Sequence, residues 1–252
     1  MPAPKPMPDR AAIVTGASSG IGFAVARLLG EEGWGVTLAA RRPEKLEAAH
    51  DELKNAGHDV QQVSGNLGME EDIKLVVDAH REKYGRCDLL MNNAGVGIGE
   101  AVGDLTTKKV DIQINTNFRS IPLFYREAID MLRAAGAEHR NALVVNTSSL
   151  SGKQGEAWLS VYSATKHAVI GFTQAMNKEL AADGIKSCAL CPGFVDTPMT
   201  DFVKGMVPAE DMITTEDIAE SVRFLLKMSP GCVIPEIVFQ RPGGELLPQA
   251  RD

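Results

Sequence analysis

The sequence predicts an α/β domain in which helices cover both faces of a mainly parallel β-sheet. Short runs of β-branched and apolar residues alternate with longer segments that carry apolar residues at helical spacing. A glycine-rich turn joins the first run to the first helical segment, and no repeat or linker divides the chain after residue 10. Strands that alternate with helices are typical of βαβ units, whose crossover helices cover a parallel sheet.

The predicted strands are, in chain order, 11–16, 35–40, 59–64, 88–95, 142–148, 185–191 and 236–240. The segments between them predict helices. In 215–228, for example, Ile218, Val222 and Leu225 share one face, and Thr215 is expected to cap the helix. We expect one domain over residues 11–245, a disordered lead-in at 1–10, and a substrate lid at about 195–213.

Composition and charge exclude several classes of protein. The chain is 44% hydrophobic and 23% charged, as expected of a globular domain, and its net charge of −7 offers no basic footprint for nucleic acid. No apolar run approaches the roughly 20 residues that cross a bilayer, and the opening MPAPKPMPDR has no apolar core of a signal peptide. We therefore expect a cytoplasmic protein with neither a nucleic-acid nor a membrane partner.

The cysteines and histidines do not predict a metal site. Cys188 and Cys191 have a redox or zinc spacing, but they lie in the apolar run IKSCALC and no second pair completes a zinc site. We interpret them as thiols of a buried strand. The five histidines show no ligand spacing, so they are expected to be surface or packing residues.

The turn after the first strand, TGASSGIG at 15–22, predicts a phosphate-binding loop. A glycine-rich turn that opens a helix directs backbone N–H groups and the helix dipole at one spot, which favours a pyrophosphate. The spacing GxxxGxG differs from GxGxxG, and a tight turn without a ligand is the alternative. A second glycine-rich stretch, 95–99, is expected to be a flexible loop beside the site.

Tyr162 and Lys166 are candidates for acid–base chemistry. They are four residues apart on the helical pattern 160–182, so their side chains share a face. A free tyrosine has a pKa of about 10 and exchanges protons poorly at neutral pH. A nearby ammonium is expected to stabilise the phenolate and lower that pKa. An ordinary surface pair is the alternative when this motif is taken alone.

Together with four later stretches, the loop resembles the short-chain dehydrogenase/reductase family over about residues 11–228. The stretches are Asn92-Asn93-Ala94-Gly95, Asn117 in TNFRS, Ser149 in NTSSLSG, and Tyr162-Ser163-Ala164-Thr165-Lys166. The resemblance implies a Rossmann-type sheet with strand order 3-2-1-4-5-6-7. It also implies a homodimer or homotetramer formed through helices at about 106–134 and 160–182.

The resemblance implies a role for each of four residues. Tyr162 would exchange a proton with the substrate oxygen, and Lys166 would also bind the nicotinamide ribose. Ser149 would donate to the substrate oxygen and orient it. Asn117 would hold a water that links Lys166 to solvent, although composition alone would equally allow Asn115.

The end of the second strand predicts NADP(H) as the cofactor. Members that use NAD have an acidic residue there, whereas this chain has Ala40 followed by Arg41 and Arg42, whose guanidinium groups suit a 2′-phosphate. Two arginines that merely cap a surface turn are the alternative. The other implied cofactor contacts are Gly16, Ser18, Ser19, Gly20, Ile21, Gly22, Asn66, Leu67, Asn93, Ala94, Gly95, Tyr162, Lys166, Pro192, Gly193, Val195 and Thr197.

The expected activity is the interconversion of a carbonyl and a secondary alcohol on a small organic substrate. The implied pocket residues are Ser149, Val96, Trp158, Phe194 and Met199, with an apolar lid after Pro198; these apolar residues could equally serve only to seal the lid. A 3-oxoacyl-type reductase is the second substrate class, weakened because the chain has PEIVFQRPGG where such enzymes have a VDGG-like end. A protein that binds NADPH as a sensor or scaffold without turnover is the alternative function.

Overall fold

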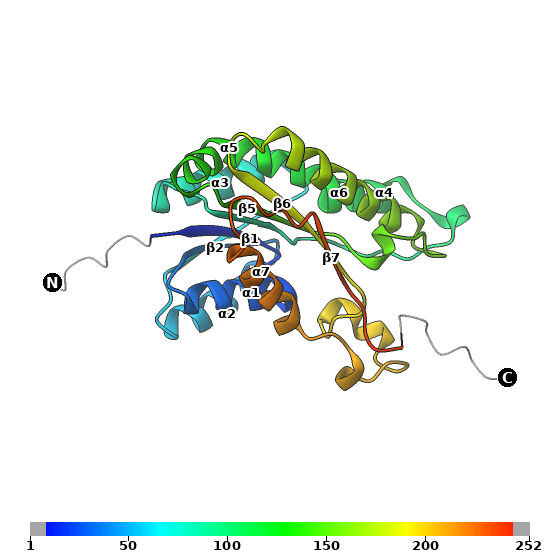
Figure 1. The fold of residues 1–252 in the computed structure, drawn as a ribbon. Coiled ribbons are helices and arrows are strands. Elements are labelled where there is room, and N and C mark those ends of the chain that lie inside the picture. The colour runs from blue at the N-terminus through cyan, green and yellow to red at the C-terminus, as the bar shows by residue number, and fades with distance from the viewer. Residues whose placement is uncertain (1–8, 244–252) are drawn as a thin grey trace.

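The computed structural model describes residues 9–243, in which two layers of helices enclose a β-sheet (Figure 1). Residues 1–8 of the lead-in expected at 1–10, and the last two residues of the expected domain, 244 and 245, lie outside the described residues. In Figure 1, α3, α4, α5 and α6 lie above the sheet, and α1, α2 and α7 lie below it.

The sheet is parallel throughout and has the order β3-β2-β1-β4-β5-β6-β7, which confirms the expected order. Its strands are β1 (Ala11–Thr15), β2 (Gly35–Ala40), β3 (Val60–Ser64), β4 (Leu89–Asn92), β5 (Ala142–Thr147), β6 (Ile185–Pro192) and β7 (Glu236–Phe239). The order reverses direction between β1 and β4. A ligand crevice forms at such a point, outside the carboxyl ends of the strands.

Each face of the sheet has its own apolar core, because successive strand residues point to opposite faces. Val14 packs with Leu29 and Val222 on the side of α1 (Gly20–Glu31), α2 (Pro43–Asn55) and α7 (Thr215–Leu226). Ile13 packs with Phe124 on the side of α3 (Glu70–Tyr84), α5 (Ser120–His139) and α6 (Ser160–Glu179). The remaining helix, α4 (Thr107–Ile114), is followed by a π-helical turn, η2 (Asn115–Arg119).

Four short 3₁₀ helices complete the described elements: η1 (Val102–Asp104), η3 (Leu150–Gly152), η4 (Pro198–Val203) and η5 (Ala209–Asp211). The last two lie within the expected lid at 195–213. The segment expected to be a lid therefore has some secondary structure of its own.

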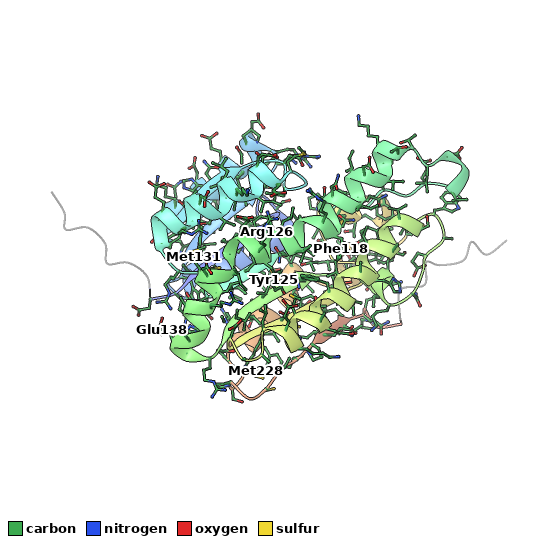
Figure 2. The ribbon with its side chains drawn as sticks, turned by 90° about the horizontal axis from the view of Figure 1, so that it is seen from above. Phe118, Tyr125, Arg126, Met131, Glu138 and Met228 are labelled. Atoms are coloured by element: carbon green, nitrogen blue, oxygen red, sulfur yellow. The ribbon has the colours of Figure 1, made fainter. Side chains whose placement is uncertain are left out.

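Helix α5 connects the upper helical layer to the sheet (Figure 2). Tyr125 lies on the side of α5 toward α6, where its ring meets Phe172 edge-on at 5.2 Å and its hydroxyl donates to Ser187 Oγ in β6 at 2.9 Å. Arg126 points the other way and pairs with Glu70 of α3 at 2.6 Å. These contacts fix the helix that precedes the site described below.

The structure corrects the predicted ends of three helices. The cap of α7 is Thr214 and not Thr215: Thr214 Oγ1 accepts from Asp217 N, and the Asp217 carboxylate accepts from Thr214 N. Thr214 has extended backbone, as a capping residue requires, and the helix ends at Leu226. Helix α6 ends at Glu179, and the segment expected to end at 134 continues to His139.

Cys188 and Cys191 lie in β6 and are buried, which confirms that they are thiols of a buried strand. Each of the four cysteines is a free thiol. Over residues 9–243 no three His, Cys, Asp or Glu side chains are arranged to hold a metal ion. No helix in that range is both long enough and apolar enough to span a membrane.

Candidate active site

The glycines of the first turn are required by close packing. Gly16 has φ 66°, and a Cβ there would lie 2.9 Å from Asn93 Nδ2. Gly20 has φ 58°, and a Cβ there would lie 3.0 Å from Thr197 Cγ2. A Cβ at Gly22 would lie 2.5 Å from Gly16 O. Larger residues would push the turn out of shape, since backbone with positive φ disfavours side chains.

The N-terminus of α1 is open to an anion. Its capping residue, Ser19, is exposed and makes no side-chain capping hydrogen bond, and the first turn has no acidic residue. Backbone N–H groups at such a helix start lack partners within the helix and carry the positive end of its dipole. Ser18 is half-buried next to this turn. The turn therefore fits a pyrophosphate.

Arg41 and Arg42 follow the buried Ala40 at the carboxyl end of β2, and both are exposed. Neither guanidinium group makes a hydrogen bond or an ion pair with another described residue. Two unpaired cations at this place fit a phosphate better than a ribose diol. They do not cap α2 with their side chains, because the capping residue Arg42 makes no side-chain capping bond.

Asn66 and Leu67 lie at the carboxyl end of β3, as expected. Asn66 is exposed, and its Oδ1 accepts from Gly68 N at 3.2 Å, so part of its side chain stabilises its own turn. Its amide NH₂ makes no hydrogen bond with another described residue. Leu67 is buried in the upper core.

Asn93 joins β4 to the glycine-rich turn. Its Nδ2 donates to Thr15 O at 3.1 Å, and its backbone N–H donates to Thr15 Oγ1 at 2.9 Å. Ala94 N donates to the same hydroxyl at 3.0 Å. The Asn93 Oδ1 accepts from Thr147 Oγ1 at 3.2 Å. The sequence did not single out Thr15 or Thr147, because hydroxyl groups at strand ends carry no local signal.

Tyr162 and Lys166 share a face of α6, and the Lys166 Nζ lies 5.5 Å from the centroid of the Tyr162 ring. The lysine is buried, with 4% of its surface exposed, and its Nζ donates to Thr147 O at 2.7 Å. Burial lowers the pKa of Lys166 to about 8. Lys166 therefore populates both its ammonium form and its neutral amine form near neutral pH.

The expected lowering of the Tyr162 pKa is wrong for this structure. Burial raises the pKa of Tyr162, and a hydrogen bond with the Ser149 side chain opposes this only in part. The ammonium of Lys166 lies over the ring and is bound to a carbonyl, so the desolvation of the phenol dominates. The phenol is therefore protonated at neutral pH and can serve as an acid.

Asn117 lies beside the lysine, in the π-helical turn η2. Its side-chain amide is buried and exchanges two hydrogen bonds with the backbone of Val96, at 2.8 and 2.9 Å. A Cβ at Gly95 would lie 3.4 Å from Asn117 Oδ1 and 3.6 Å from Lys166 Nζ, so glycine keeps this small space open. Asn115, the alternative, instead approaches Gly68.

The π-helical turn was not predicted, because one extra residue in a helical turn leaves the apolar spacing nearly unchanged. Such turns occur frequently at functional sites. Here the turn carries Asn117 to the carboxyl end of the sheet.

The stretch after β6 lies over the glycine-rich turn. Gly193 N donates to Phe239 O at 3.0 Å, and Val195 pairs with Ile213 in an isolated bridge. Thr197 caps η4 and approaches Gly20. The Pro192 carbonyl accepts from Ser149 Oγ at 3.5 Å.

The apolar residues of the lid divide into two groups. Val203, Val207 and Met212 are buried together, with Phe194 packed against them, so these residues form a small apolar cluster within the segment itself. Met199, Phe202 and Met206 are exposed. The role of the second group in a substrate pocket stays a prediction.

Trp158 and Val96 lie on the opposite rim, where Trp158 is exposed and Val96 is half-buried. Trp158 has φ 67°, a left-handed conformation that is uncommon outside glycine, and its carbonyl accepts from Glu100 N at 2.7 Å. Backbone strain of this kind clusters at ligand sites. A Cβ at Gly97 would lie 3.9 Å from the Tyr162 ring, so the loop 95–99 does lie beside the phenol.

Comparison with known proteins agrees with this geometry. A family model described as short chain dehydrogenase matches residues 10–206. A protein described as a ketoacyl reductase of the monensin polyketide synthase of Streptomyces virginiae is 40% identical over 211 residues, which is 83% of this chain and 79% of that protein.

Two solved structures share the fold. An actinorhodin polyketide ketoreductase with NADPH has a TM-score of 0.82 and 33% identity, over 91% of this chain and 95% of that chain. A metagenomic short-chain oxidoreductase in complex with NADP has a TM-score of 0.79 and 30% identity, over 92% of this chain and 96% of that chain.

Proposed function

The chain belongs to the short-chain dehydrogenase family and is an NADP-dependent oxidoreductase; on that premise, we propose that it interconverts a carbonyl group and a secondary alcohol on a small organic substrate. One observation carries the proposal. A neutral, half-buried phenol lies within hydrogen-bond reach of Ser149 and directly beside the buried Lys166, at the carboxyl end of the sheet.

NADP(H), when bound, supplies or accepts the hydride. In reduction, the Ser149 hydroxyl donates to the substrate oxygen and orients it, and Tyr162 transfers its phenolic proton to that oxygen. The Lys166 ammonium then stabilises the phenolate left behind. Because the pKa of Lys166 is about 8, the lysine can itself release and regain a proton near neutral pH. Asn117 borders the space next to its Nζ, where a water could continue the relay.

The proposed cofactor contacts follow from two features. The glycine-rich turn and the open start of α1 would hold the pyrophosphate, while Arg41 and Arg42 would hold the 2′-phosphate of NADP(H). Thr197, close to Gly20, would cover the turn from the lid side.

The substrate is proposed to lie between the rim at Trp158 and the exposed lid residues Met199, Phe202 and Met206. A 3-oxoacyl thioester is the second substrate class, because the relative from Streptomyces virginiae is described as a ketoacyl reductase. Following NADPH absorbance against ketones, aldehydes, 3-oxoacyl thioesters, steroids and quinones separates these classes.

We also propose a homodimer or homotetramer. Small residues on the exposed side of α6 (Ala164, Gly171 and Ala175) would allow a second copy to approach closely. Sedimentation measures the number of copies, and a monomer at micromolar concentration contradicts this part of the proposal.

Replacement of the phenol tests the proposed chemistry. Tyr162→Phe should lower turnover by ~10²–10⁴-fold, because the proton donor is lost, while the Kd for NADPH stays within ~2-fold. Turnover is followed by NADPH absorbance and binding by NADPH fluorescence. Tyr84→Phe is the matched control, since the Tyr84 hydroxyl bonds to Asp59, outside the site. A Tyr162→Phe variant that keeps most of its activity removes Tyr162 as the proton donor.

If the wild-type protein binds NADPH but reduces no compound of the panel, the sensor or scaffold function replaces the enzymatic one.

A further inference from the structure

The ammonium of Lys166 has a single hydrogen-bond acceptor among the described residues. That acceptor is the carbonyl oxygen of Thr147, the last residue of β5, at 2.7 Å. A buried cation with one acceptor depends strongly on the position of that acceptor. The orientation of the Thr147 peptide therefore affects both the place of the ammonium and its affinity for a proton.

The side chain of the same residue points to the cofactor turn. Thr147 Oγ1 donates to Asn93 Oδ1 at 3.2 Å, and Asn93 Nδ2 donates to Thr15 O at 3.1 Å. The Asn93 amide also fills the space behind the turn, because a Cβ at Gly16 or Gly22 would lie 2.9 or 2.7 Å from its Nδ2. An unbroken series of hydrogen bonds thus runs from the glycine-rich turn to the lysine.

Thr147 is nearly buried, and the following residue supports the same helix. Ser148 Oγ donates to the backbone carbonyl of Lys166 at 2.8 Å. The last residue of β5 and the residue after it therefore fix the lysine at two points, its ammonium and its backbone.

We propose that Thr147 is a positioning residue that couples the glycine-rich cofactor turn to Lys166, through its hydroxyl on one side and its carbonyl on the other. The inference rests on the proposed function. It predicts that loss of the hydroxyl changes cofactor binding and lysine protonation together, whereas a threonine that only fills space would change stability alone.

Two other titratable groups face the ammonium among the described residues. They are the Tyr162 phenol on α6 and the Cys191 thiol on β6. Burial raises the pKa of Cys191 to about 11, so the thiol stays neutral through the range in which Lys166 titrates. Burial also raises the pKa of Tyr162, so a change of the pH profile near pH 8 reports the lysine.

The test compares Thr147→Val, Thr147→Ser and Thr37→Val. Valine keeps the shape of threonine without its hydroxyl, and serine restores the hydroxyl. Thr37 is the matched control, because its hydroxyl is equally buried in the sheet and bonds to His80 Nδ1 at 2.7 Å, away from the site. All variants are measured for NADPH Kd by fluorescence, for the pH profile of carbonyl reduction, and for thermal stability.

Thr147→Val should raise the NADPH Kd by ~2–10-fold, the range that one lost hydrogen bond gives. A less well placed acceptor lowers the pKa of Lys166 further, so the ammonium is lost at lower pH. The alkaline limb of the reduction profile should therefore move down by ~0.5–1 pH unit. Thr147→Ser should restore both values, and Thr37→Val should lose stability without changing either.

The inference is overturned if Thr147→Val keeps the wild-type Kd and profile, or if Thr37→Val shifts them equally. Failure of the proposed function is distinguishable from this outcome. NADPH binding, and titration of the lysine by NMR of ¹³C-labelled protein, require no turnover and still test Thr147 if no substrate is reduced.

Discussion

Lys166 and Asp88 are buried charges at opposite ends of the same sheet, and they differ in how well each is paired. Lys166 lies at the carboxyl end of β5 and has one carbonyl as its acceptor. Asp88 precedes β4, at the amino end, with 1% of its surface exposed. Burial destabilises both charges, because each loses its hydration. Only Asp88 has enough hydrogen-bond and ion-pair partners to offset this loss.

Both carboxylate oxygens of Asp88 have hydrogen-bond partners. Its Oδ2 accepts from Ala11 N at 2.9 Å and Arg86 Nε at 2.8 Å, and its Oδ1 accepts from Arg86 Nη2 at 2.7 Å and lies 2.9 Å from His139 Nε2. Burial alone would raise the pKa of Asp88, yet the bonds from Arg86, His139 and Ala11 hold it below its usual range. This carboxylate is locked in its charged form and ties β1, β4 and α5 together.

The same difference separates two arginines. Arg86 binds Asp88 with two nitrogens and also pairs with Glu138 at 3.0 Å. Arg41, at the carboxyl end of β2, is paired with no other described residue. The amino end of the sheet thus has satisfied charges that stabilise the fold, and the carboxyl end has unsatisfied charges that remain available to ligands.

The largest expected effect is that of Lys166→Met. Turnover should fall by ~10³-fold, because the phenolate loses its cation. The free energy of unfolding should rise by ~1–3 kcal/mol, because a poorly compensated buried charge is replaced by an apolar chain of similar length. Urea titration and NADPH kinetics measure the two quantities. A destabilised variant would show that the lysine is a structural charge like Asp88.

Asp88→Asn should have the opposite pattern. The free energy of unfolding should fall by ~2–4 kcal/mol, because Arg86 loses the buried carboxylate that binds two of its nitrogens and keeps only the exposed Glu138 as an ion-pair partner. Turnover per folded molecule should stay within ~2-fold of wild type, since the change is at the far end of the sheet. Urea titration gives the stability, and activity is normalised to the folded fraction. A specific loss of turnover would mean that the two ends of the sheet are not independent.

Arg41→Ala should raise the KM for NADPH by ~10–100-fold and leave the KM for NADH within ~2-fold. The reason is that only NADPH carries the 2′-phosphate that the free guanidinium group would bind. Lys45→Ala is the matched control, because Lys45 is an exposed cation in the first turn of α2. A wild-type enzyme that prefers NADH contradicts the assignment of Arg41.

The smallest effect is expected in the pH dependence of stability. The pKa of Lys166 is lowered in the fold, so between about pH 8 and pH 10.5 the unfolded chain binds more protons at this group, and stability gains as pH rises. The advantage of Lys166→Met over wild type should therefore shrink by ~1–2 kcal/mol across this window. Urea titrations of both proteins at pH 7.5 and 10 check the difference. A constant difference would mean that the lysine titrates normally.

Much of the fold could be predicted, because it depends on patterns within short segments. The seven strands were located to within a few residues from their apolar runs, and the strand order followed from the family resemblance. Tyr162 and Lys166 could be paired because a spacing of four residues places side chains on one helix face. The structure places Asn117, Ser149, Tyr162 and Lys166 near the carboxyl ends of the strands, and their catalytic roles stay a prediction.

The rest depends on contacts between distant segments, which leave no local pattern. Asp88 bonds to residues 77 and 51 positions away. The link from Thr147 to Asn93 spans 54 positions. The raised pKa of Tyr162 depends on how deeply α6 packs, and the cap of α7 differed by one residue because two adjacent threonines are equally good candidates.

The π-helical turn at Asn115–Arg119 makes this region sensitive to chain length. Each residue of an α-helix rotates the chain by about 100°, so deletion of one residue here would restore ordinary spacing while turning α4 by that angle relative to α5. Asn117 would leave the side of Lys166, and the loop held by its amide would lose its anchor. We therefore expect substitutions on the surface of α4 to be tolerated far more readily than the insertion or deletion of a residue in this turn.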